Sequence, residues 1–457
     1  MKVILLAAGR SKRMKPVEDK NFLEFLGKPL IVHQLELLKK AGLTDVVVVG
    51  GGHNLGRICT IGDEIGVKID LCEQENLDLG MAGAVLAAEK FIGKEPVLIF
   101  SNNDAVEESA FKSLLKAADG NADSFLLCKK MDEYFPGGYV EIEGSYGGCG
   151  DGGIGGGGGG FIKNIVEKPG RGFEPGNLVN IVLHVHKNPA KLVEYLKKID
   201  SKKDDRYEAA LALMMRDGVR MKAVEYNGLW QPIKYPWHVH RVFRQFFENA
   251  VGVKGAKKMI SKKAQIAKSA VINGDVIIEE GVKVLDGAVI SGPCYIGSGS
   301  IVATNALVRG SHVGQNCVIG FGSEIARSYL GNDVWTHTNY IGDSVIGNNV
   351  SFGGGTVVGN LRLDEQNVIM DFDGVKVDCG SNKFGVVVGD NVRVGINASL
   401  MPGVKIGEES FVGAGIVVSE NIPEKSFVRG EWKLKISANN FNAAKLRRNA
   451  KIVDNDR

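Results

Sequence analysis

The sequence predicts an α/β domain followed by a parallel β-helix. Through residue 235, short all-apolar runs alternate with segments of helical periodicity, which is typical of a mostly parallel sheet with helices on both faces. From Ile266 onward an apolar residue returns every six positions, as expected when each step forms one flat face of a β-helix. A chain of 457 residues is also too long for one ordinary core. We expect an α/β domain at 1–235, a linker helix at 236–262, a β-helix at 263–432 and a basic tail at 433–457.

Composition argues against several classes of protein. The formal net charge is +3, so nothing indicates a nucleic-acid or membrane partner. The seven cysteines are odd in number and dispersed without metal-binding spacing, which favours a reducing cytoplasm over a disulfide framework. No apolar run approaches membrane-spanning length, and residues 3–8 are too short for a signal-peptide core. We therefore expect a cytoplasmic protein.

The strands and helices of the first domain can be placed in order. Pro29 stands at the start of the first helix and Gly42 just after its end, as helix boundaries favour. Because ligands of parallel sheets bind beyond the carboxyl ends of the strands, candidate binding regions follow at Gly9, after Leu71 and after Phe100. The expected strands cover 3–8, 46–49, 69–71, 96–100 and 124–127, and the expected helices cover 29–41, 83–91 and 110–118.

The first strand leads into a loop of small residues and cations. Ala7, Ala8 and Gly9 let a ligand approach the backbone, whose N–H groups can hold phosphate oxygens. Arg13 and Lys20 can neutralise a triphosphate. The alternative from these residues alone is a strand, a turn and a solvated basic loop.

Three segments resemble the signature of sugar-1-phosphate nucleotidylyltransferases: residues 6–14 (Leu-Ala-Ala-Gly-Arg-Ser-Lys-Arg-Met), 20–23 (Lys-Asn-Phe-Leu) and 27–31 (Gly-Lys-Pro-Leu-Ile). The resemblance implies a Rossmann-like nucleotidyltransferase domain. Ser11 stands where the family usually has glycine, so we expect the loop to sit slightly differently over the triphosphate. By the same resemblance, the nucleotide is expected to contact Leu6, Ala7, Ala8, Gly9, Gln74 and Gly80, with Gln74 reading the base, and catalysis is expected of Arg13 and Lys20.

Asp104 follows the predicted strand that ends at Phe100. In the family an aspartate here holds the catalytic Mg²⁺, and a hard cation takes carboxylate oxygen while keeping waters and phosphates as further ligands. The family's second metal-binding aspartate falls on Pro232, which has no ligand atom. Either Glu225 or Asn227 replaces it, or the metal keeps an extra water. The alternative is that Asp104 is only a turn residue.

Four further residues match the sugar-binding positions of the family. The resemblance implies that Gly138 passes close to the sugar, that Glu167 accepts sugar hydroxyls, that Lys168 holds the attacking phosphate and that Asn180 contacts the sugar. Taken alone, Glu167 and Lys168 would more often be a surface ion pair. The glycine-rich run at 147–160 carries no predicted function.

Beyond a linker helix, whose His238 and His240 are expected at its surface, the six-residue repeat dominates. It resembles the left-handed β-helix of hexapeptide-repeat acyltransferases, which implies a left-handed parallel β-helix and association as a homotrimer with active sites between subunits. The predicted inward residues are Ile266, Ile272, Ile278, Val284, Ile290, Ile296, Val302, Val308, Val313, Ile319, Ile325, Tyr340, Ile346, Phe352, Val358, Val388, Val394, Leu400, Ile406, Val412 and Val418.

Residues 336–343, 346–356 and 358–360 resemble the acetyltransferase half of bifunctional N-acetylglucosamine-1-phosphate uridylyltransferases. The resemblance implies that His337 is a general base, which suits its near-neutral pKa. The alternative is a histidine that caps an exposed coil. The implied sugar-phosphate ligands are Tyr340, Ser351 (asparagine in the family), Asn360 and Lys383, and the implied acetyl-CoA contacts are Gly354, Ile396 and Ala414.

We therefore expect a bifunctional enzyme of nucleotide-sugar synthesis. Its first domain joins UTP or dTTP to a hexose or hexosamine 1-phosphate with Mg²⁺, and its second acetylates an amino-sugar phosphate with acetyl-CoA. One alternative is a nucleotidylyltransferase whose β-helix serves only assembly. Another is a catalytically weak binding or regulatory protein, which Pro232 and Ser351 favour.

Overall fold

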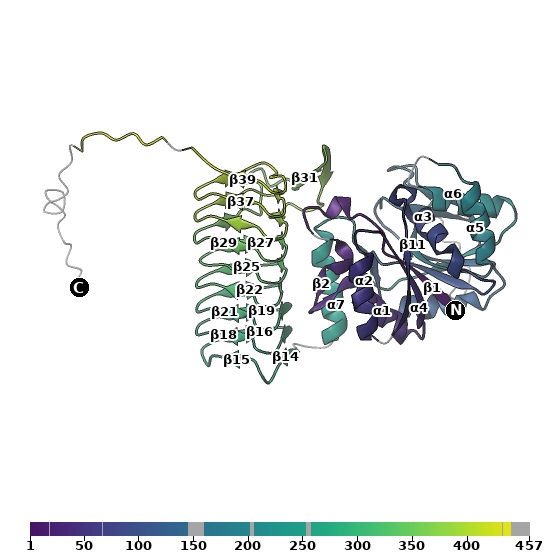
Figure 1. Cartoon of the computed structure of the whole chain (residues 1–457), viewed down its shortest axis with the longest axis horizontal. Coiled ribbons are helices and arrows are strands. Elements are labelled where there is room, and N and C mark those ends of the chain that lie inside the picture. The colour runs from purple at the N-terminus through teal and green to yellow at the C-terminus, as the bar shows by residue number, and fades with distance from the viewer. Residues whose placement is uncertain are drawn as a thin grey trace.

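The computed structural model describes residues 1–17, 19–65, 67–144, 160–201, 205–252, 257–431 and 433–439. An α/β part lies beside a β-helix (Figure 1). The predicted glycine run lies outside the described residues except for Gly160, and so does the tail from residue 440. No helix of the described residues is long and apolar enough to span a membrane.

The α/β part is built on a nine-stranded sheet with the order β10-β9-β11-β6-β1-β4-β5, and β8 and β12 extend it from β11. Strand β1 runs parallel to β4 and β6, as predicted, whereas β11 runs antiparallel to β6, β8 and β9. The strands are β1 (Lys2–Leu6), β4 (Asp45–Gly50), β5 (Lys68–Glu73), β6 (Val97–Ser101), β8 (Ser124–Lys130), β9 (Gly138–Ile142), β10 (Ile162–Glu167), β11 (Leu178–His186) and β12 (Met221–Glu225).

Helices cover both faces of this sheet. Val3 and Leu5 of β1 pack in one core with α1 and α4, and Ile4 and Leu6 pack in the other with α3, α5 and α6, because successive strand residues face opposite sides. The three predicted helices are confirmed, and α2, α5 and α6 were not predicted. The helices are α1 (Leu30–Lys40), α2 (Leu55–Ile65), α3 (Gly80–Ala87), α4 (Glu108–Ala118), α5 (Pro189–Lys198) and α6 (Arg206–Arg216), with 3₁₀ turns η1 (Lys12–Met14), η2 (Lys20–Phe22), η3 (Leu77–Leu79) and η4 (Ala88–Phe91).

Short elements complete the first half. Strand β7 (Asp104–Val106) pairs antiparallel with β13 (Trp230–Pro232), and β2 (Glu24–Phe25) pairs with β3 (Lys28–Pro29). Helix α7 (His238–Val251) then leads to the β-helix.

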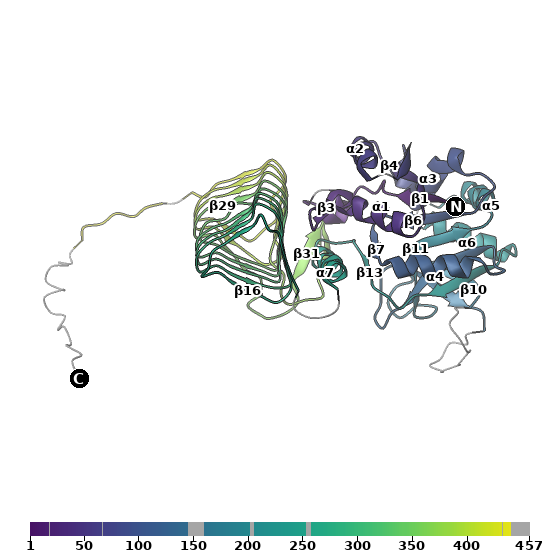
Figure 2. The ribbon, with the colours of Figure 1, turned by 90° about the horizontal axis from the view of Figure 1, so that it is seen from below.

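The β-helix has a triangular cross-section, which Figure 2 shows nearly end-on. Its neighbouring strands are parallel, and a hairpin of β31 (Ile369–Phe372) and β32 (Val375–Asp378) leaves it in the predicted excursion. The first face contains β14 (Lys258–Ile260), β17 (Val276–Ile278), β20 (Cys294–Ile296), β23 (His312–Val313), β26 (Tyr329–Leu330), β28 (Val345–Ile346), β33 (Val387–Val388) and β36 (Lys405–Ile406).

The second face contains β16 (Val271–Asn273), β19 (Val289–Ser291), β22 (Leu307–Arg309), β25 (Glu324–Ala326), β27 (Tyr340–Gly342), β30 (Val357–Val358), β35 (Ser399–Leu400) and β38 (Val417–Val418). The third face contains β15 (Gln265–Ile266), β18 (Lys283–Val284), β21 (Ile301–Val302) and β24 (Val318–Ile319), then β29 (Ser351–Phe352), β34 (Arg393–Val394), β37 (Phe411–Val412) and β39 (Phe427–Val428).

The six-residue repeat forms the core of the β-helix, with one correction. From Ile278 onward the predicted inward residues are buried in a single cluster, except Tyr340. Ile341 occupies the inward position instead, because it lies in register with Ile325 of the previous coil. Tyr340 therefore faces outward, where its hydroxyl is available for contacts.

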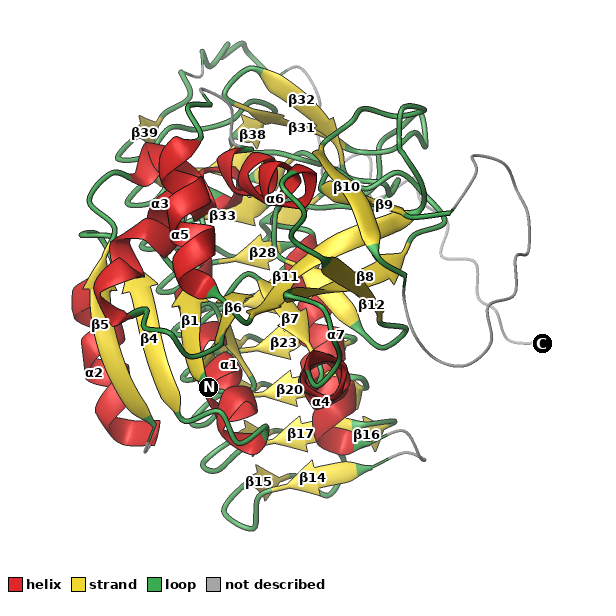
Figure 3. Cartoon of the chain, turned by 90° about the vertical axis from the view of Figure 1, so that its right-hand side faces the viewer, coloured by secondary structure: helices red, strands yellow, loops and turns green. Residues whose placement is uncertain are grey.

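The first face of the β-helix, here called the docking face, packs against the α/β part. Figure 3 shows the sheet and its helices in front of the strands of this face. Outward residues such as Tyr295 and Tyr329 share a core with Phe25 and Phe243. The Tyr329 hydroxyl donates to the Glu24 carbonyl at 2.9 Å.

Helix α7 lies in this interface, so the expectation of surface histidines was wrong. His240 Nε2 lies 3.0 Å from the carbonyl oxygen of Ser344 on the β-helix. His238 Nδ1 accepts from the backbone N–H of Lys234 at 3.1 Å. The His240 ring therefore contacts the β-helix, whereas the His238 ring binds the backbone just before its own helix.

Candidate active sites

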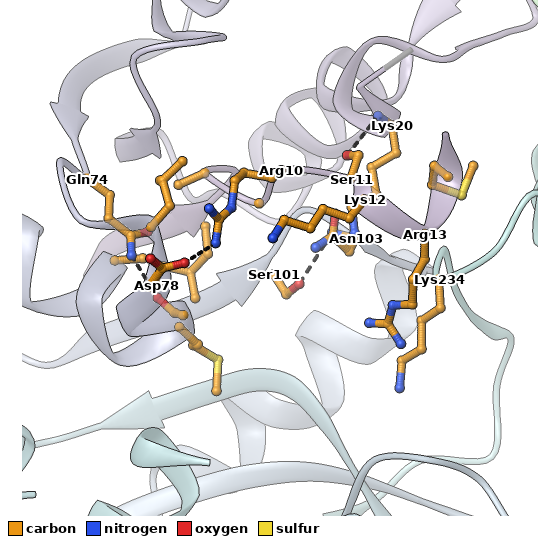
Figure 4. Close-up of a pocket in the computed structure, with 18 residues that line it drawn as sticks. Arg10, Ser11, Lys12, Arg13, Lys20, Gln74, Asp78, Ser101, Asn103 and Lys234 are labelled. Carbon is orange, nitrogen blue, oxygen red and sulfur yellow. Dashed lines mark hydrogen bonds and ion pairs between the residues drawn. The ribbon is translucent and has the colours of Figure 1, made fainter. Parts of the chain in front are cut away.

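A cavity of 720 Å³ opens beyond the carboxyl ends of β1 and β6 (Figure 4). Most of the residues predicted to bind the nucleotide line it, together with the predicted Arg13 and Lys20. Ala7 and Asp104 are buried and do not line it. The lining residues are Leu6, Ala8, Gly9, Arg10, Ser11, Lys12, Arg13, Met14, Lys20, Gln74, Leu77, Asp78, Gly80, Met81, Ala84, Ser101, Asn103 and Lys234.

Hydrogen bonds fix the loop after β1. Ser11 adopts a left-handed backbone with φ of 51°, a conformation that glycine reaches at least cost. Its hydroxyl donates to Asp19 Oδ1 at 3.1 Å and accepts from the N–H of Lys20 at 3.3 Å. The Ala7 carbonyl accepts from the side-chain amides of Asn21 and Asn54 at 2.8 and 2.9 Å. These bonds give the Ser11 hydroxyl a structural role in the loop.

The predicted base reader, Gln74, is already partly engaged. Its Nε2 donates to the carbonyls of Asn76 and Gly80 at 3.0 and 2.9 Å. The amide oxygen of Gln74 is therefore the group left to accept from a base. Nearby, Arg10 and Asp78, which both line the cavity, form an ion pair.

Three cations gather at the other end of the cavity: Arg13, Lys20 and Lys234 (Figure 4). Burial, with the nearby Arg13 charge, lowers the pKa of Lys20 to about 8. Burial likewise lowers the pKa of Lys234 to about 8, although the charge of Asp104 opposes the shift. Sequence reasoning missed Lys234, because nothing local distinguishes it from a surface lysine in the segment after Pro232.

Asp104 is buried, and the charges of Lys234 and Lys20 act on its carboxyl. Burial raises the pKa of its carboxyl, whereas the hydrogen bond from Trp230 Nε1, 2.8 Å from Oδ1, and the charge of Lys234 oppose that rise. Pro232 is its partner across the pair of β13 and β7. Glu225, considered above as a replacement ligand, forms an ion pair with Lys130 at 3.2 Å.

The donors near Asp104 fit Mg²⁺ in a site completed by substrate. Asn103, which directly precedes Asp104 in the sequence, has a buried Oδ1 without a hydrogen-bond partner in the described structure. This amide oxygen is therefore a second oxygen ligand that a cation held by Asp104 could use. Nowhere in the described ranges do three or more His, Cys, Asp or Glu residues form a group that could hold a metal. Mg²⁺ commonly takes one or two carboxylates and fills its other positions with phosphate and water oxygens.

The predicted sugar ligands Gly138, Glu167 and Asn180 meet in one place, here called the sugar site. A methyl group built on Gly138 would lie 3.1 Å from Glu167 Oε2 and 3.6 Å from Asn180 Cβ. Glycine at this position keeps the space between the two side chains open. Lys168 Nζ lies 2.8 Å from Glu167 Oε1, and the Lys168 charge also acts on Lys234. The sugar site therefore adjoins the cation cluster.

On the β-helix, the predicted sugar-phosphate ligands Tyr340 and Asn360 lie together, with Asn360 Nδ2 3.2 Å from the Tyr340 hydroxyl. Asn360 also donates to Asp343, which Arg327 holds by two bonds of 2.6 and 2.7 Å. Sequence analysis did not single out Arg327.

A further cavity of 270 Å³, here called the α7 pocket, lies beside this network. Lys383, the other predicted sugar-phosphate ligand, lines it. Arg241 and Arg244 of α7 and Arg327 of the β-helix line it as well, against the single carboxylate of Asp343. The pocket is therefore strongly cationic, and it contains residues from both halves of the chain.

The predicted acetyl-CoA contacts form a column across three coils. The N–H of Asn397 donates to the Gly354 carbonyl at 3.0 Å, and the N–H of Gly415 donates to the Ile396 carbonyl at 2.8 Å. These contacts stack Gly354, Ile396 and Ala414 along one corner, two residues beyond the paired strands β29, β34 and β37. His337 is exposed at the head of the column, where its Cβ lies 3.9 Å from a methyl group built on Gly354. Ser351 is half-buried in β29.

Comparison with known proteins confirms both predicted parts. A family model described as a MobA-like NTP transferase domain matches residues 3–266. Models described as a GMPPB C-terminal domain and as six bacterial transferase hexapeptide repeats match residues 255–342 and 385–419.

Relatives match nearly the whole chain. A bifunctional sugar-1-phosphate nucleotidylyltransferase/acetyltransferase of Sulfurisphaera tokodaii is 29% identical and covers 94% of this chain and 100% of its own. The bifunctional protein GlmU of Methanococcus vannielii is 30% identical, and the match covers 96% of this chain and 100% of that protein. GlmU of Methanococcus maripaludis strain C5 is 32% identical, and the match covers 96% of this chain and 99% of that protein. Since such relatives align over almost their full length at this identity, the chain belongs to the family of bifunctional GlmU proteins.

Proposed function

We propose that the first half of the chain, residues 1–235, transfers a nucleotidyl group from UTP or dTTP to a sugar 1-phosphate. The observation that carries this proposal is the cluster of Arg13, Lys20 and Lys234 between the 720 Å³ cavity and the sugar site. An oxygen of the sugar phosphate forms a bond to the α-phosphorus, the bond from that phosphorus to the bridging oxygen breaks, and pyrophosphate leaves. The fixed cations stabilise the negative charge that develops in the transition state.

The two substrates would be oriented by opposite ends of the site. The amide oxygen of Gln74 accepts the N3–H of uracil or thymine, which suits either nucleotide. Glu167 accepts sugar hydroxyls and Lys168 holds the sugar phosphate. Asp104, with Asn103 beside it, would hold Mg²⁺, which supplies positive charge to the phosphates when bound.

We further propose that the β-helix, residues 263–432, acetylates an amino-sugar phosphate with acetyl-CoA. His337 takes the proton of the amine as the amine nitrogen bonds to the acetyl carbon. The carbon–sulfur bond then breaks, and the sulfur takes that proton from His337, so coenzyme A leaves as the thiol. The backbone N–H of Gly354 would stabilise the thioester oxygen. Tyr340, Asn360 and the cations of the α7 pocket would hold the sugar phosphate.

Assembly as a homotrimer would complete this second site. The docking face is covered by the α/β part, which leaves the other two faces for subunit contacts. Val357 and Val417 on the second face are 47% and 63% exposed, and Ile396 beside the acetyl-CoA column is 56% exposed. Large apolar side chains exposed in this way suit burial between subunits. We place the trimer in the cytoplasm, as its free thiols among the described cysteines suggest.

A product assay tests both activities. Purified full-length protein is incubated with Mg²⁺ and a panel of nucleoside triphosphates and sugar 1-phosphates, and pyrophosphate and nucleotide sugars are measured. A second reaction follows release of free coenzyme A with glucosamine 1-phosphate or galactosamine 1-phosphate. Absence of pyrophosphate release across the panel would refute the first proposal. Absence of coenzyme A release would leave the β-helix as a scaffold.

A further inference from the structure

A chain of buried hydrogen bonds leads to the sugar site from the interior of the α/β part. It contains Ser124 of β8, His186 and His184 of β11, Tyr207 of α6 and Asn180 of β11. All five side chains are less than one-tenth exposed. The successive contacts measure 2.9 Å from Ser124 Oγ to His186 Nδ1, 3.0 Å from His186 Nε2 to Tyr207 Oη, 2.9 Å from Tyr207 Oη to His184 Nδ1 and 2.7 Å from His184 Nε2 to Asn180 Oδ1.

The fold brings these residues together through strand alternation. Asn180, His184 and His186 occupy even positions of β11 and so share one face of the strand. The register of β11 against β8 shifts between Ile181 and His184, but the even-numbered residues of β11 stay on the same face of the strand. Helix α6 covers the same core and brings the Tyr207 hydroxyl within reach of both rings.

Both imidazoles are held neutral. Burial, reinforced by His186, lowers the pKa of His184 well below its usual value, and the Ile181 carbonyl opposes this only in part. Burial alone lowers the pKa of His186 to about 4. A neutral imidazole carries one ring hydrogen, so each ring donates once and accepts once in this chain.

The acceptor at the end then sets the direction of the whole chain. In the orientation of the Asn180 amide that places Oδ1 2.7 Å from His184 Nε2, the oxygen can only accept, so His184 donates from Nε2 and accepts at Nδ1 from the Tyr207 hydroxyl. The Tyr207 oxygen accepts from His186 Nε2–H, and His186 Nδ1 accepts from the Ser124 hydroxyl. Every hydrogen bond therefore points toward Asn180, which leaves its NH₂ group unused by the chain.

We propose that this chain is a positioning device which turns the Asn180 NH₂ group into the sugar site. It rests on the proposed nucleotidyl transfer and deepens it. Glu167, which flanks the same space, is an acceptor, so the site presents one donor beside one acceptor. That pair recognises a pyranose 1-phosphate through two ring substituents, one hydroxyl that donates to Glu167 and one oxygen that accepts from Asn180.

The direction of these hydrogen bonds can be tested without an activity assay. In full-length protein labelled with ¹⁵N at histidine, long-range proton–nitrogen correlation spectra report which ring nitrogen carries the hydrogen. His184 and His186 should both be Nε2–H and remain neutral at pH 5.5, below the usual histidine pKa. Assignment comes from His184→Gln and His186→Gln spectra. A hydrogen on His184 Nδ1 would reverse the chain and overturn the proposal.

The consequence for substrate is tested by two variants. Tyr207→Phe removes the central hydroxyl, and Asn180→Asp keeps an acceptor for His184 but has no NH₂ group. Each should raise KM for the sugar 1-phosphate about 10-fold, the effect of about one lost hydrogen bond, while KM for the nucleotide and kcat stay unchanged. Tyr195→Phe, which removes a hydroxyl bonded to Asp217 at 2.7 Å on the neighbouring helix, is the matched control and should change neither KM.

Asn180→Asp keeps the shape of asparagine, and its melting temperature, compared with wild type, reports any destabilisation by the added charge. Unchanged KM for the sugar 1-phosphate in a folded Asn180→Asp protein, or an equal rise for both substrates, would overturn the positioning role. A wild-type protein that makes no nucleotide sugar would refute the proposed function instead, while the tautomer spectra would still report on the hydrogen-bond chain.

Discussion

Pro232 stands directly opposite Asp104 in the antiparallel pair of β13 and β7. A side chain without a ligand atom thus occupies the position where the sequence resemblance implied a second metal-binding carboxylate. Two residues further on, Lys234 brings a positive charge to the same carboxylate. Asp104 thus faces a proline on one side and the charge of Lys234 on another, and the first two predictions concern these two residues, Asp104 and Lys234.

Asp104→Asn should abolish Mg²⁺-dependent pyrophosphate release, because the amide is a neutral and weaker ligand for a hard cation. Lys20→Ala should weaken the reaction without changing its dependence on Mg²⁺. Initial rates across a Mg²⁺ titration separate the two effects. Wild-type activity in Asp104→Asn would place the metal elsewhere.

Lys234→Ala should lower kcat/KM of nucleotidyl transfer by roughly 10- to 100-fold, the usual worth of a hydrogen bond to a charged group. The reason is the lost positive charge between Asp104 and the sugar site. Steady-state kinetics with both substrates provide the measurement. Lys112→Ala, on the exposed side of α4, serves as the control, and an equal effect there would refute a specific role for Lys234.

His337→Ala should lower acetyl transfer by roughly 10²–10⁴-fold, the usual contribution of a positioned general base. Nucleotidyl transfer should be unaffected, because its cavity is in the other half of the chain. Coenzyme A release and pyrophosphate release are followed in the same preparation. If both activities fall together, the variant has damaged the fold and the assignment of His337 fails.

Ser351→Asn should raise acetyl transfer, since the longer amide restores the side chain that the sequence resemblance implied as a ligand of the sugar phosphate. The effect should appear as a lower KM for the amino-sugar phosphate. A decrease in activity would mean that the smaller serine is required by the packing of β29.

His312→Phe should make the free energy of unfolding depend less steeply on pH in acid. The ring lies between Tyr295 and Tyr329 in the docking interface, with centroid distances of 4.9 and 4.7 Å, and burial lowers its pKa from 6.5 to about 4. Below pH 6.5 the unfolded chain binds a proton that the folded protein does not, so the free energy of unfolding falls as pH falls from 6.5 toward 4, by up to about 1.4 kcal/mol per pH unit for each such group.

Urea unfolding at several pH values measures that slope. His312→Phe should reduce the slope by the share of one group. A slope in His312→Phe equal to that of wild type would show that His312 does not contribute. The remaining slope is expected from other buried histidines such as His186, whose pKa is also lowered to about 4.

The sequence by itself determined the two folds and the position of the cationic loop. The six-residue repeat predicts inward residues because each coil buries the same position, and only at Tyr340 did the register shift by one, to Ile341. The loop at Gly9 was predictable because a small-residue turn after a buried strand is a local pattern. Signals of this kind depend only on residues that are near one another in the chain.

The tertiary structure alone decided which distant side chains meet. Lys234 reaches Asp104 only because β13 pairs with β7, and His240 is drawn into an interface because α7 packs on the docking face. Likewise, Ser124 and Tyr207 join Asn180 through sheet register and helix packing. Periodicity reports whether a residue is buried, but not which partner it meets there, because that partner is set by the packing of elements far apart in the chain.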